Sequence, residues 1–287
     1  MGKIFQALEK SDKDRFSSVE EPLGLDESPA AESMTGSGGN SGLGEKPGRR
    51  EENNAEQEYL GFLDSSIISE HRPHSLEAEQ FRILKNSILF PNKGEPPRSI
   101  MVTSTAPSEG KSFVATNLAV TIAKSIDDYV LLIDCDLRRP TVHTRFGFPN
   151  NTPGLSEHLS MGVPIPSLLK KTVIDKLTIL PCGTIPANPS ELVSSEQMKR
   201  LIQEVRSRYE DRYIILDSPP PYLTSEANAL ARQVDGIILV VKIGFTKKEA
   251  VRDLIDTYGR RKILGVVKNY SAPKKTVGYK NAYVYQQ

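Results

Sequence analysis

Cysteine is scarce in this sequence, and so is any imbalance of charge. Cys135 and Cys182 are the only cysteines among 287 residues, and neither belongs to a Cys-x-x-Cys pair. Zinc sites, iron–sulfur sites and disulfide frameworks use paired or clustered cysteines, so the pattern argues against all three, and we expect both thiols to be reduced, as in a cytosolic protein. The formal net charge is only +1, so no global field favours nucleic acid or an acidic substrate.

Long apolar runs are also missing. The longest, residues 236–241, has the length of a buried strand, whereas a membrane-spanning helix needs roughly 18 apolar residues. The first residues lack the apolar core of a signal peptide. Gly2 does not predict N-myristoylation either, because Gln6 stands where Ser or Thr is required. We therefore expect a cytoplasmic protein without a membrane anchor of its own.

The hydrophobic fraction, 38%, is low for a chain that is packed throughout. Ile4, Phe5 and Leu8 could form one face of a short amphipathic helix. The Gly-, Ser- and charge-rich sequence that follows cannot bury enough apolar surface to offset its ordering entropy, and we expect it to be disordered. The predicted organisation is a helix at 1–12, a disordered linker at 13–58, a folded domain at 59–269 and a flexible tail at 270–287.

Short apolar segments alternate with amphipathic ones in the predicted domain. This alternation indicates βαβ units, and right-handed crossovers between them give a doubly wound, mostly parallel α/β sheet with helices on both faces. Ligands of such sheets bind at the carboxyl ends of the strands. The predicted strands are 100–103, 130–134, 177–180, 213–217, 236–242 and 263–268, and the predicted helices are 112–125, 194–209, 224–232 and 246–258, preceded by a helix that Ser75 caps and Pro91 ends.

A phosphate-binding loop is predicted at residues 104–112, between the first strand and the first long helix of this alternation. Backbone N–H groups and the positive helix end would cradle phosphates, Lys111 would reach the β- and γ-phosphates, and Ser112 would bind Mg²⁺. The fold is therefore expected to be of the P-loop NTPase type and to bind ATP with Mg²⁺. Thr105 replaces the usual first glycine, and a strand–helix turn that contains Gly-Lys-Ser by chance is the alternative. The predicted nucleotide-binding residues are Thr105, Ala106, Pro107, Ser108, Glu109, Gly110, Lys111, Ser112 and Phe113.

Two further strands end in carboxylates. Asp217 follows Ile-Ile-Leu and precedes Ser-Pro, which is typical of a Walker B strand that delivers a ligand to Mg²⁺. Asp134 and Asp136 are two residues apart, so on an extended segment they face the same side. The alternatives are that Asp217 caps the next helix and that Asp134 and Asp136 are only turn residues.

These three segments together resemble the bacterial tyrosine kinases of capsule and exopolysaccharide synthesis. The resemblance rests on the loop at 105–112, on Asp-x-Asp-x-Arg at 134–138, on Asp-x-x-Pro at 217–220 and on Asn-Pro-Ser-Glu-Leu at 188–192. It implies a protein tyrosine kinase that uses ATP and Mg²⁺. The roles that it implies are phosphate and Mg²⁺ binding by Lys111 and Ser112, metal coordination by Asp134 and Asp217, orientation or deprotonation of the incoming tyrosine by Asp136, and organisation of the site by Arg138.

The resemblance also implies an assembly and a partner. Its helical motif Glu-x-x-Arg-x-x-Arg-x-Asn reads Glu79, Arg82, Lys85 and Ser87 here, so two of its four positions differ. A homo-oligomeric ring through this helix is one interpretation; an ordinary amphipathic helix with a Glu79–Arg82 surface pair is the other. Members without a membrane span work with a membrane polysaccharide copolymerase, a chain-length regulator that activates them. We therefore expect a protein peripheral to the inner membrane through that partner.

Tyr270, Tyr279, Tyr283 and Tyr285 lie in the predicted tail. The resemblance implies that such tyrosines are phosphorylated in trans by a neighbouring subunit. The tail has lysines and no acids, so we also expect it to be attracted to an acidic Mg²⁺ site. The alternatives are that these tyrosines lie in an exposed tail by chance, or that the lysines and tyrosines of the tail bind nucleic acid.

Two other functions remain open at this stage. A partitioning or positioning ATPase would carry a signature lysine five residues before Lys111, where this chain has Ala106. A nucleotide-binding adaptor of the export machine would explain the departures from the family pattern, which are Thr105, Ser108, Lys85, Ser87 and Glu226.

Overall fold

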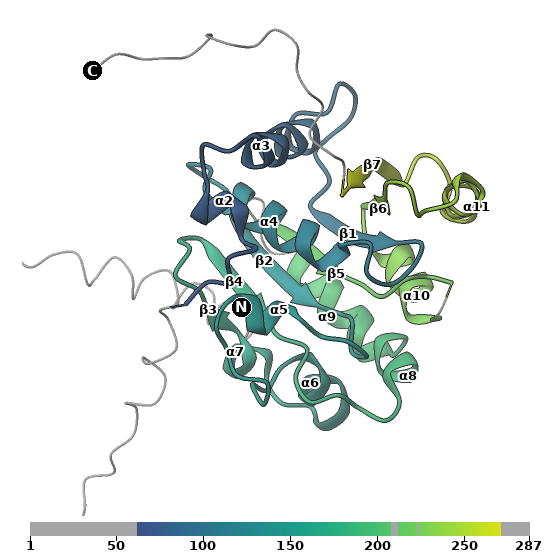
Figure 1. Cartoon of the computed structure of the whole chain (residues 1–287). Coiled ribbons are helices and arrows are strands. Elements are labelled where there is room, and N and C mark those ends of the chain that lie inside the picture. The colour runs from purple at the N-terminus through teal and green to yellow at the C-terminus, as the bar shows by residue number, and fades with distance from the viewer. Residues whose placement is uncertain (1–61, 208–211, 223, 271–287) are drawn as a thin grey trace, which may run out of the picture.

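The computed structural model describes residues 62–207, 212–222 and 224–270 (Figure 1). The predicted helix at 1–12, the predicted linker at 13–58 and the tail after Tyr270 lie outside the described residues. Within them the chain forms a sheet of seven strands in the order β3-β4-β2-β5-β1-β6-β7. Only the β3–β4 pair is antiparallel. The doubly wound, mostly parallel α/β fold is therefore confirmed. The strands are β1 Ser99–Ser104, β2 Tyr129–Asp134, β3 Lys170–Lys171, β4 Leu177–Leu180, β5 Arg212–Asp217, β6 Gly236–Lys242 and β7 Ile263–Asn269.

Helices cover both faces of this sheet (Figure 1). Two large apolar clusters lie on its opposite faces, because successive strand residues point alternately to one face and the other. The helices are α2 Ile68–His71, α3 Leu76–Leu89, α4 Lys111–Ala123, α5 Val142–Arg145, α6 Leu155–Met161, α7 Ile165–Leu168, α8 Pro189–Val193, α9 Glu196–Ser207, α10 Glu226–Gln233 and α11 Lys248–Tyr258.

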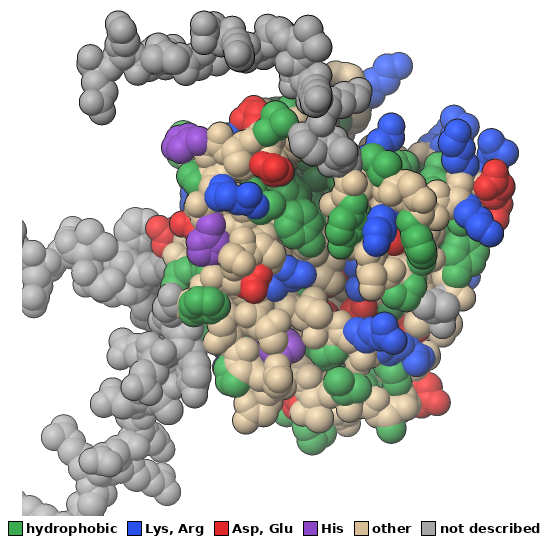
Figure 2. Space-filling model, viewed as in Figure 1, with side chains coloured by type: hydrophobic (Ala, Val, Ile, Leu, Met, Phe, Trp, Pro, Cys, Tyr) green, Lys and Arg blue, Asp and Glu red, His purple; other side chains and the backbone are tan. Residues whose placement is uncertain are grey.

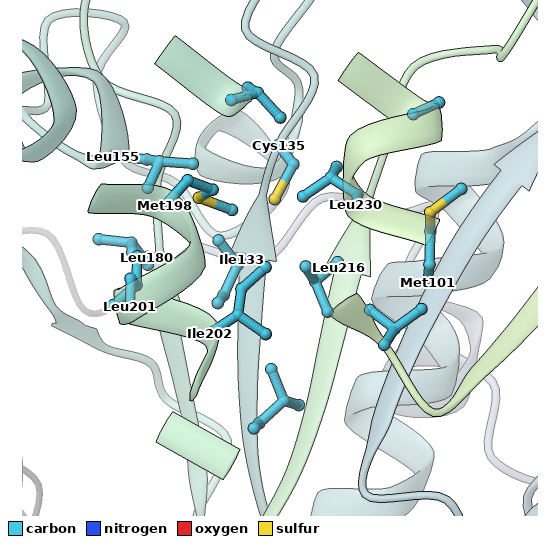
Figure 3. Close-up of a cluster of buried hydrophobic side chains, with 14 of the residues drawn as sticks. Met101, Ile133, Cys135, Leu155, Leu180, Met198, Leu201, Ile202, Leu216 and Leu230 are labelled. Atoms are coloured by element: carbon cyan, nitrogen blue, oxygen red, sulfur yellow. The ribbon is translucent and has the colours of Figure 1, made fainter. Parts of the chain in front are cut away.

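The cluster beneath α9 and α10 contains Cys135, which stands among Met198, Leu230 and Ile133 (Figure 3). Both cysteines are buried and free, as expected. Burial raises the pKa of the Cys135 thiol well above its usual range, so this cysteine is an apolar packing residue and not a nucleophile.

The opposite cluster is built around α4, whose residues from Val114 to Ala123 are all buried between the sheet and α3. Ser75 caps α3 as predicted, because its side chain accepts a hydrogen bond from the Ala78 amide at 3.1 Å. Phe81, Ile88 and Leu89 of α3 are buried and Leu84 is half-buried. The helix that carries the phosphate loop is therefore fixed on all sides.

The end of the sheet at β7 is less covered. Only Leu254 of α11 is fully buried, and Lys and Arg side chains gather near α11 on the face shown in Figure 2. No helix in the described part of the chain is long and apolar enough to cross a membrane.

Candidate active site

Residues 105–110 join β1 to α4 at the carboxyl edge of the sheet, as the phosphate-loop prediction requires. Gly110 has φ +94°, and a Cβ there would lie 2.0 Å from Nδ2 of Asn269. Only glycine fits a left-handed backbone under such an approach. The loop is therefore shaped by β7 as well as by its own sequence.

Glu109 is the one predicted nucleotide-binding residue whose side chain is fully enclosed. Its carboxylate accepts hydrogen bonds from the Thr105 hydroxyl and the Ala106 amide, each at 3.0 Å, and from the Thr246 hydroxyl. The Glu109 side chain thus ties the loop together from within. Thr105, in place of the usual glycine, provides one of the donors.

Lys111, the first residue of α4, lies next to Asp136 from the segment after β2. Its Nζ is 2.7 Å from Oδ2 of Asp136, and both side chains are largely buried. Burial alone would lower the pKa of Lys111, but the carboxylates of Asp217 and Asp136 outweigh it and the pKa is raised. The lysine is therefore held as a cation at the centre of an acidic cluster.

Asp134 and Asp217 end neighbouring parallel strands and are paired in register. Asp134 is fully buried, and it accepts hydrogen bonds from the amides of Asp136 at 3.2 Å and of Thr141 and Val142 at 3.1 Å. Burial, and then repulsion from Asp217, raise the pKa of Asp134 to about 8. Both oxygens of Asp134 thus hold the turn before α5, which is the structural role considered as the alternative for this residue.

Asp217 differs from Asp134 in its contacts. It is fully buried, and neither of its carboxylate oxygens accepts a hydrogen bond of good geometry within the described residues, although the nearby Ser112 hydroxyl helps to lower its pKa. Burial raises the pKa of Asp217, although attraction to Lys111 opposes the shift. A buried carboxylate without donors needs a cation or a proton.

The oxygen atoms of this site suit Mg²⁺ that is bound together with a nucleotide. Mg²⁺ keeps several waters and is usually bound by one or two carboxylates plus substrate phosphates. Asp217 and the hydroxyl of Ser112 are available for that role, and Ser112 lies on the cavity wall. Among the described residues no group of three or more His, Cys, Asp or Glu side chains could hold a metal without phosphates.

A cavity of about 570 Å³ opens beside this cluster, within the usual size range for small-molecule sites. The predicted attraction of the basic tail requires a cavity lined by acidic residues, and this cavity is lined mainly by basic ones. Its charged lining residues are one acid, Asp136, and four bases, Lys111, Arg138, Arg139 and Arg145. The lining therefore suits an anionic ligand such as a nucleoside triphosphate.

Arg138 reaches this wall with partners that sequence reasoning did not identify as a group. Its Nε lies 3.0 Å from Oε1 of Glu226, and its Nη2 lies 3.1 Å from the Ser190 hydroxyl. Ser190 belongs to the Asn-Pro-Ser-Glu-Leu stretch that formed part of the resemblance, so a signal existed for it. No periodicity or spacing marks Glu226 as its neighbour.

Tyr270 is the only predicted phosphoacceptor that the structure describes. Its ring lines the cavity, and Nζ of Lys242 lies 4.8 Å from the ring centroid. Its amide donates to Oδ1 of Asn269 at 2.9 Å. Tyr279, Tyr283 and Tyr285 lie outside the described residues.

The predicted assembly motif on α3 makes contacts within the chain. Arg82 pairs with Glu79 at 2.7 Å, and Lys85 donates to Oγ of Ser125 at 3.2 Å. The Ser87 hydroxyl donates to the Leu84 carbonyl at 2.7 Å. The Glu79–Arg82 surface pair of the simpler interpretation is thus present.

A family model described as "AAA domain" matches residues 98–263. The tyrosine-protein kinase YwqD of Bacillus subtilis is 37% identical over 209 residues, which are 72% of this chain and 86% of YwqD. The chain belongs to the bacterial tyrosine kinase family. A putative tyrosine-protein kinase, CapB of Staphylococcus aureus, is 32% identical over 75% of this chain and 93% of its own length.

Solved structures agree with this membership. The kinase domain of Escherichia coli tyrosine kinase ETK has a TM-score of 0.67 and 28% identity, and the match covers 76% of this chain and 84% of that domain. MinD of Pyrococcus horikoshii in complex with Mg-ADP has a TM-score of 0.50 at 21% identity and covers 61% and 71% of the two chains, which shows the fold alone. The positioning ATPases are therefore only distant fold relatives, whereas family membership implies a nucleotide-binding kinase.

Proposed function

We propose that this chain is a protein tyrosine autokinase that transfers the γ-phosphoryl group of Mg-ATP to tyrosines of its C-terminal tail. The observation that carries the proposal is the 2.7 Å contact between Lys111 and Asp136, at the mouth of a phosphate loop and beside two buried strand-end carboxylates. A phosphate-binding cation and a candidate proton acceptor thereby occupy one site.

The loop amides and Lys111 would bind the β- and γ-phosphates and offset the negative charge that develops during transfer. Asp217 and the Ser112 hydroxyl would hold Mg²⁺ together with the phosphates, and the bound ion would supply further positive charge. Asp134 would hold the turn that carries Asp136 through its amide hydrogen bonds. It stays a candidate ligand of the metal as well, because a carboxylate has about four lone-pair sites and these bonds occupy three of them.

Asp136 is the candidate proton acceptor for the incoming tyrosine, whose hydroxyl has a pKa near 10 in water. Phosphates would compete with Asp136 for Lys111 and free one oxygen of this carboxylate. The tyrosine oxygen then forms the new P–O bond, its proton passes to Asp136, and ADP leaves.

The acceptors would be Tyr279, Tyr283 and Tyr285 of a neighbouring copy, with Tyr270 at the root of the tail. The resemblance to kinases of capsule and exopolysaccharide synthesis supports a role in that process. One solved relative is the chimerical protein CapA2B2, which is 34% identical with a TM-score of 0.64, and the match covers 71% of this chain and 89% of that chain. We propose a cytoplasmic kinase that assembles as a ring and reaches the inner membrane through a polysaccharide copolymerase that activates it.

The test is to incubate the purified protein with Mg-ATP, alone and with a candidate activator fragment, and to map phosphosites by mass spectrometry. The proposal predicts phosphotyrosine in residues 270–287 and its loss in Lys111→Met. Lys199→Met, an exposed lysine of α9, is the matched control and should keep the modification. Tail phosphotyrosine that persists in Lys111→Met would refute the assignment.

A further inference from the structure

Arg138 lies on the cavity wall, and two of its nitrogens already donate hydrogen bonds to other side chains of the protein. Glu226, the first residue of α10, binds Nε, and Ser190, in the first turn of α8, binds Nη2. The guanidinium is planar and carries five N–H donors in a fixed fork. Two anchors at different nitrogens therefore fix the plane of the group, while Arg138 still lines the cavity.

Glu226 is built as an anchor and not as a surface charge. Its side chain is 2% exposed, against 48% for Arg138. Burial alone would raise the pKa of Glu226, but its own backbone amide and the nearby Thr224, Ser190 and Arg138 outweigh it and the pKa is lowered. Among the described residues Oε1 accepts from Arg138, and Oε2 is buried without a hydrogen-bond partner of good geometry. A carboxylate that is ionised inside the protein requires its partners, and a cavity arginine is one of them.

The two anchoring helices are themselves held by the core. Leu192 and Val193 of α8 and Ala227 and Leu230 of α10 belong to one buried apolar cluster. Anchors on packed helices position a side chain more precisely than anchors on loops. The Arg138 guanidinium is thereby oriented by parts of the chain more than 50 residues away.

We propose that Glu226 and Ser190 are positioning residues that hold the Arg138 guanidinium toward the phosphoryl group in transfer. The inference rests on the proposed kinase function. In it, Arg138 uses its remaining N–H donors to stabilise charge on the γ-phosphoryl oxygens. Glu226 and Ser190 act only through Arg138, and neither touches the nucleotide.

The first test measures the rate of tail phosphorylation and the Kd for ADP in Glu226→Gln and Ser190→Ala. We expect kcat to fall about tenfold or more in Glu226→Gln, and less in Ser190→Ala, since misplacing a transition-state donor costs rate and not ground-state binding. The Kd for ADP should stay within about twofold, because the lost interaction is made only in the transition state. Glu196→Gln, an exposed glutamate of α9, is the matched control and should behave as the wild type.

The second test separates positioning from folding by a double-mutant cycle. In an Arg138→Ala background, Glu226→Gln should change kcat less than about twofold, because its effect passes through the missing guanidinium. An equal loss in both backgrounds would overturn the proposal, as would full activity of Glu226→Gln.

A third measurement does not depend on tyrosine transfer. ADP with aluminium fluoride and Mg²⁺ mimics the phosphoryl group in transfer, so the wild type should bind it more tightly than ADP alone, and Glu226→Gln should lose about tenfold or more of that gain. An unchanged gain in affinity in Glu226→Gln would contradict the proposed role of Glu226. A wild type that phosphorylates no tyrosine would contradict only the proposed kinase function, and the affinity measurement would still test Glu226.

Discussion

Asp217 shows how a single residue can be costly to the fold and useful to the site. Its carboxylate is fully buried and accepts no hydrogen bond of good geometry among the described residues, although Lys111 and the Ser112 hydroxyl lie near enough to favour its charged form. Burial raises its pKa, so the folded protein binds a proton here more readily than the unfolded chain does. Ionisation of Asp217 therefore opposes folding in the absence of a bound cation.

The sign of the pH dependence follows from this shift. Asp217 and Asp134 both have raised pKa values, and that of Asp134 is about 8. Between the unfolded value near 4 and the raised folded values, the native state holds more protons than the unfolded state, so stability without Mg²⁺ falls as pH rises through that window. Acidic side chains whose pKa is lowered on folding have the opposite effect, because they make stability rise with pH.

We predict that Asp217→Asn stabilises the protein in the absence of Mg²⁺ and nucleotide. The neutral amide is similar in shape and removes the buried charge, so the free energy of unfolding at pH 8 should rise by about 1 kcal/mol or more. Urea unfolding at pH 5 and pH 8 measures it, and the gain should be smaller at pH 5. A variant that is less stable than the wild type at pH 8 would show that Lys111 already compensates the charge.

At the scale of the secondary-structure elements, the phosphate loop is connected to the turn before α11. The Thr246 hydroxyl donates to the buried Glu109 carboxylate and accepts from the Lys242 amide at 2.8 Å. A second connection runs from the Asn269 side chain at the end of β7 to the Glu109 carbonyl, at 2.9 Å. The loop is thus held by both strands that lie beyond β1 in the sheet.

We predict that Thr246→Val destabilises the protein by about 1–3 kcal/mol, because a buried carboxylate loses a donor that water cannot replace. Nucleotide affinity should fall as well, since the loop loses one of its supports. Thr257→Val is the matched control, because this threonine of α11 is exposed and donates only to the Asp253 carbonyl; it should change stability by less than about 0.5 kcal/mol. Thermal unfolding and ADP titration measure both effects, and equal losses in the two variants would contradict the account.

The sequence predicted the long elements and missed the short ones. Apolar runs marked six of the seven strands, and Gly110 with Lys111 marked the start of α4, because burial and phosphate binding leave strong local patterns. The segment between β2 and β4 was left without prediction, although it contains α5, α6, α7 and β3. Elements of two to seven residues are too short for a period to show, and tertiary packing decides their conformation.

The candidate site divides in the same way. Lys111, Asp134, Asp136 and Asp217 were found from motifs and lie together, because strand ends in a parallel sheet meet at one edge. The inward orientation of Glu109, the amide contacts of Asp134 and the anchoring of Arg138 by Glu226 depend on side-chain rotamers and on contacts between distant segments. No local pattern in the sequence specifies these.

At the scale of the whole molecule, we propose that the phosphate site of one subunit acts on tyrosines of another. The basic lining of the cavity, with Arg138, Arg139 and Arg145, favours the triphosphate over the lysine-containing tail. We therefore expect assembly, and not charge, to bring the tail to the site, and transfer in trans, as opposed to transfer in cis, is the result that would support this expectation.

The most direct measurement mixes two variant chains, neither of which can phosphorylate a tail by itself. Lys111→Met keeps the tail and lacks the phosphate-binding lysine, whereas the fourfold Tyr→Phe variant at positions 270, 279, 283 and 285 keeps the site and lacks the acceptors. Each alone with Mg-ATP and activator should give no tail phosphotyrosine, and the mixture should give phosphotyrosine on the Lys111→Met chain, read by mass spectrometry of its tail peptides. Phosphotyrosine in the tail of Lys111→Met alone, or none in the mixture under conditions where the wild type is modified, would contradict phosphoryl transfer in trans through Lys111.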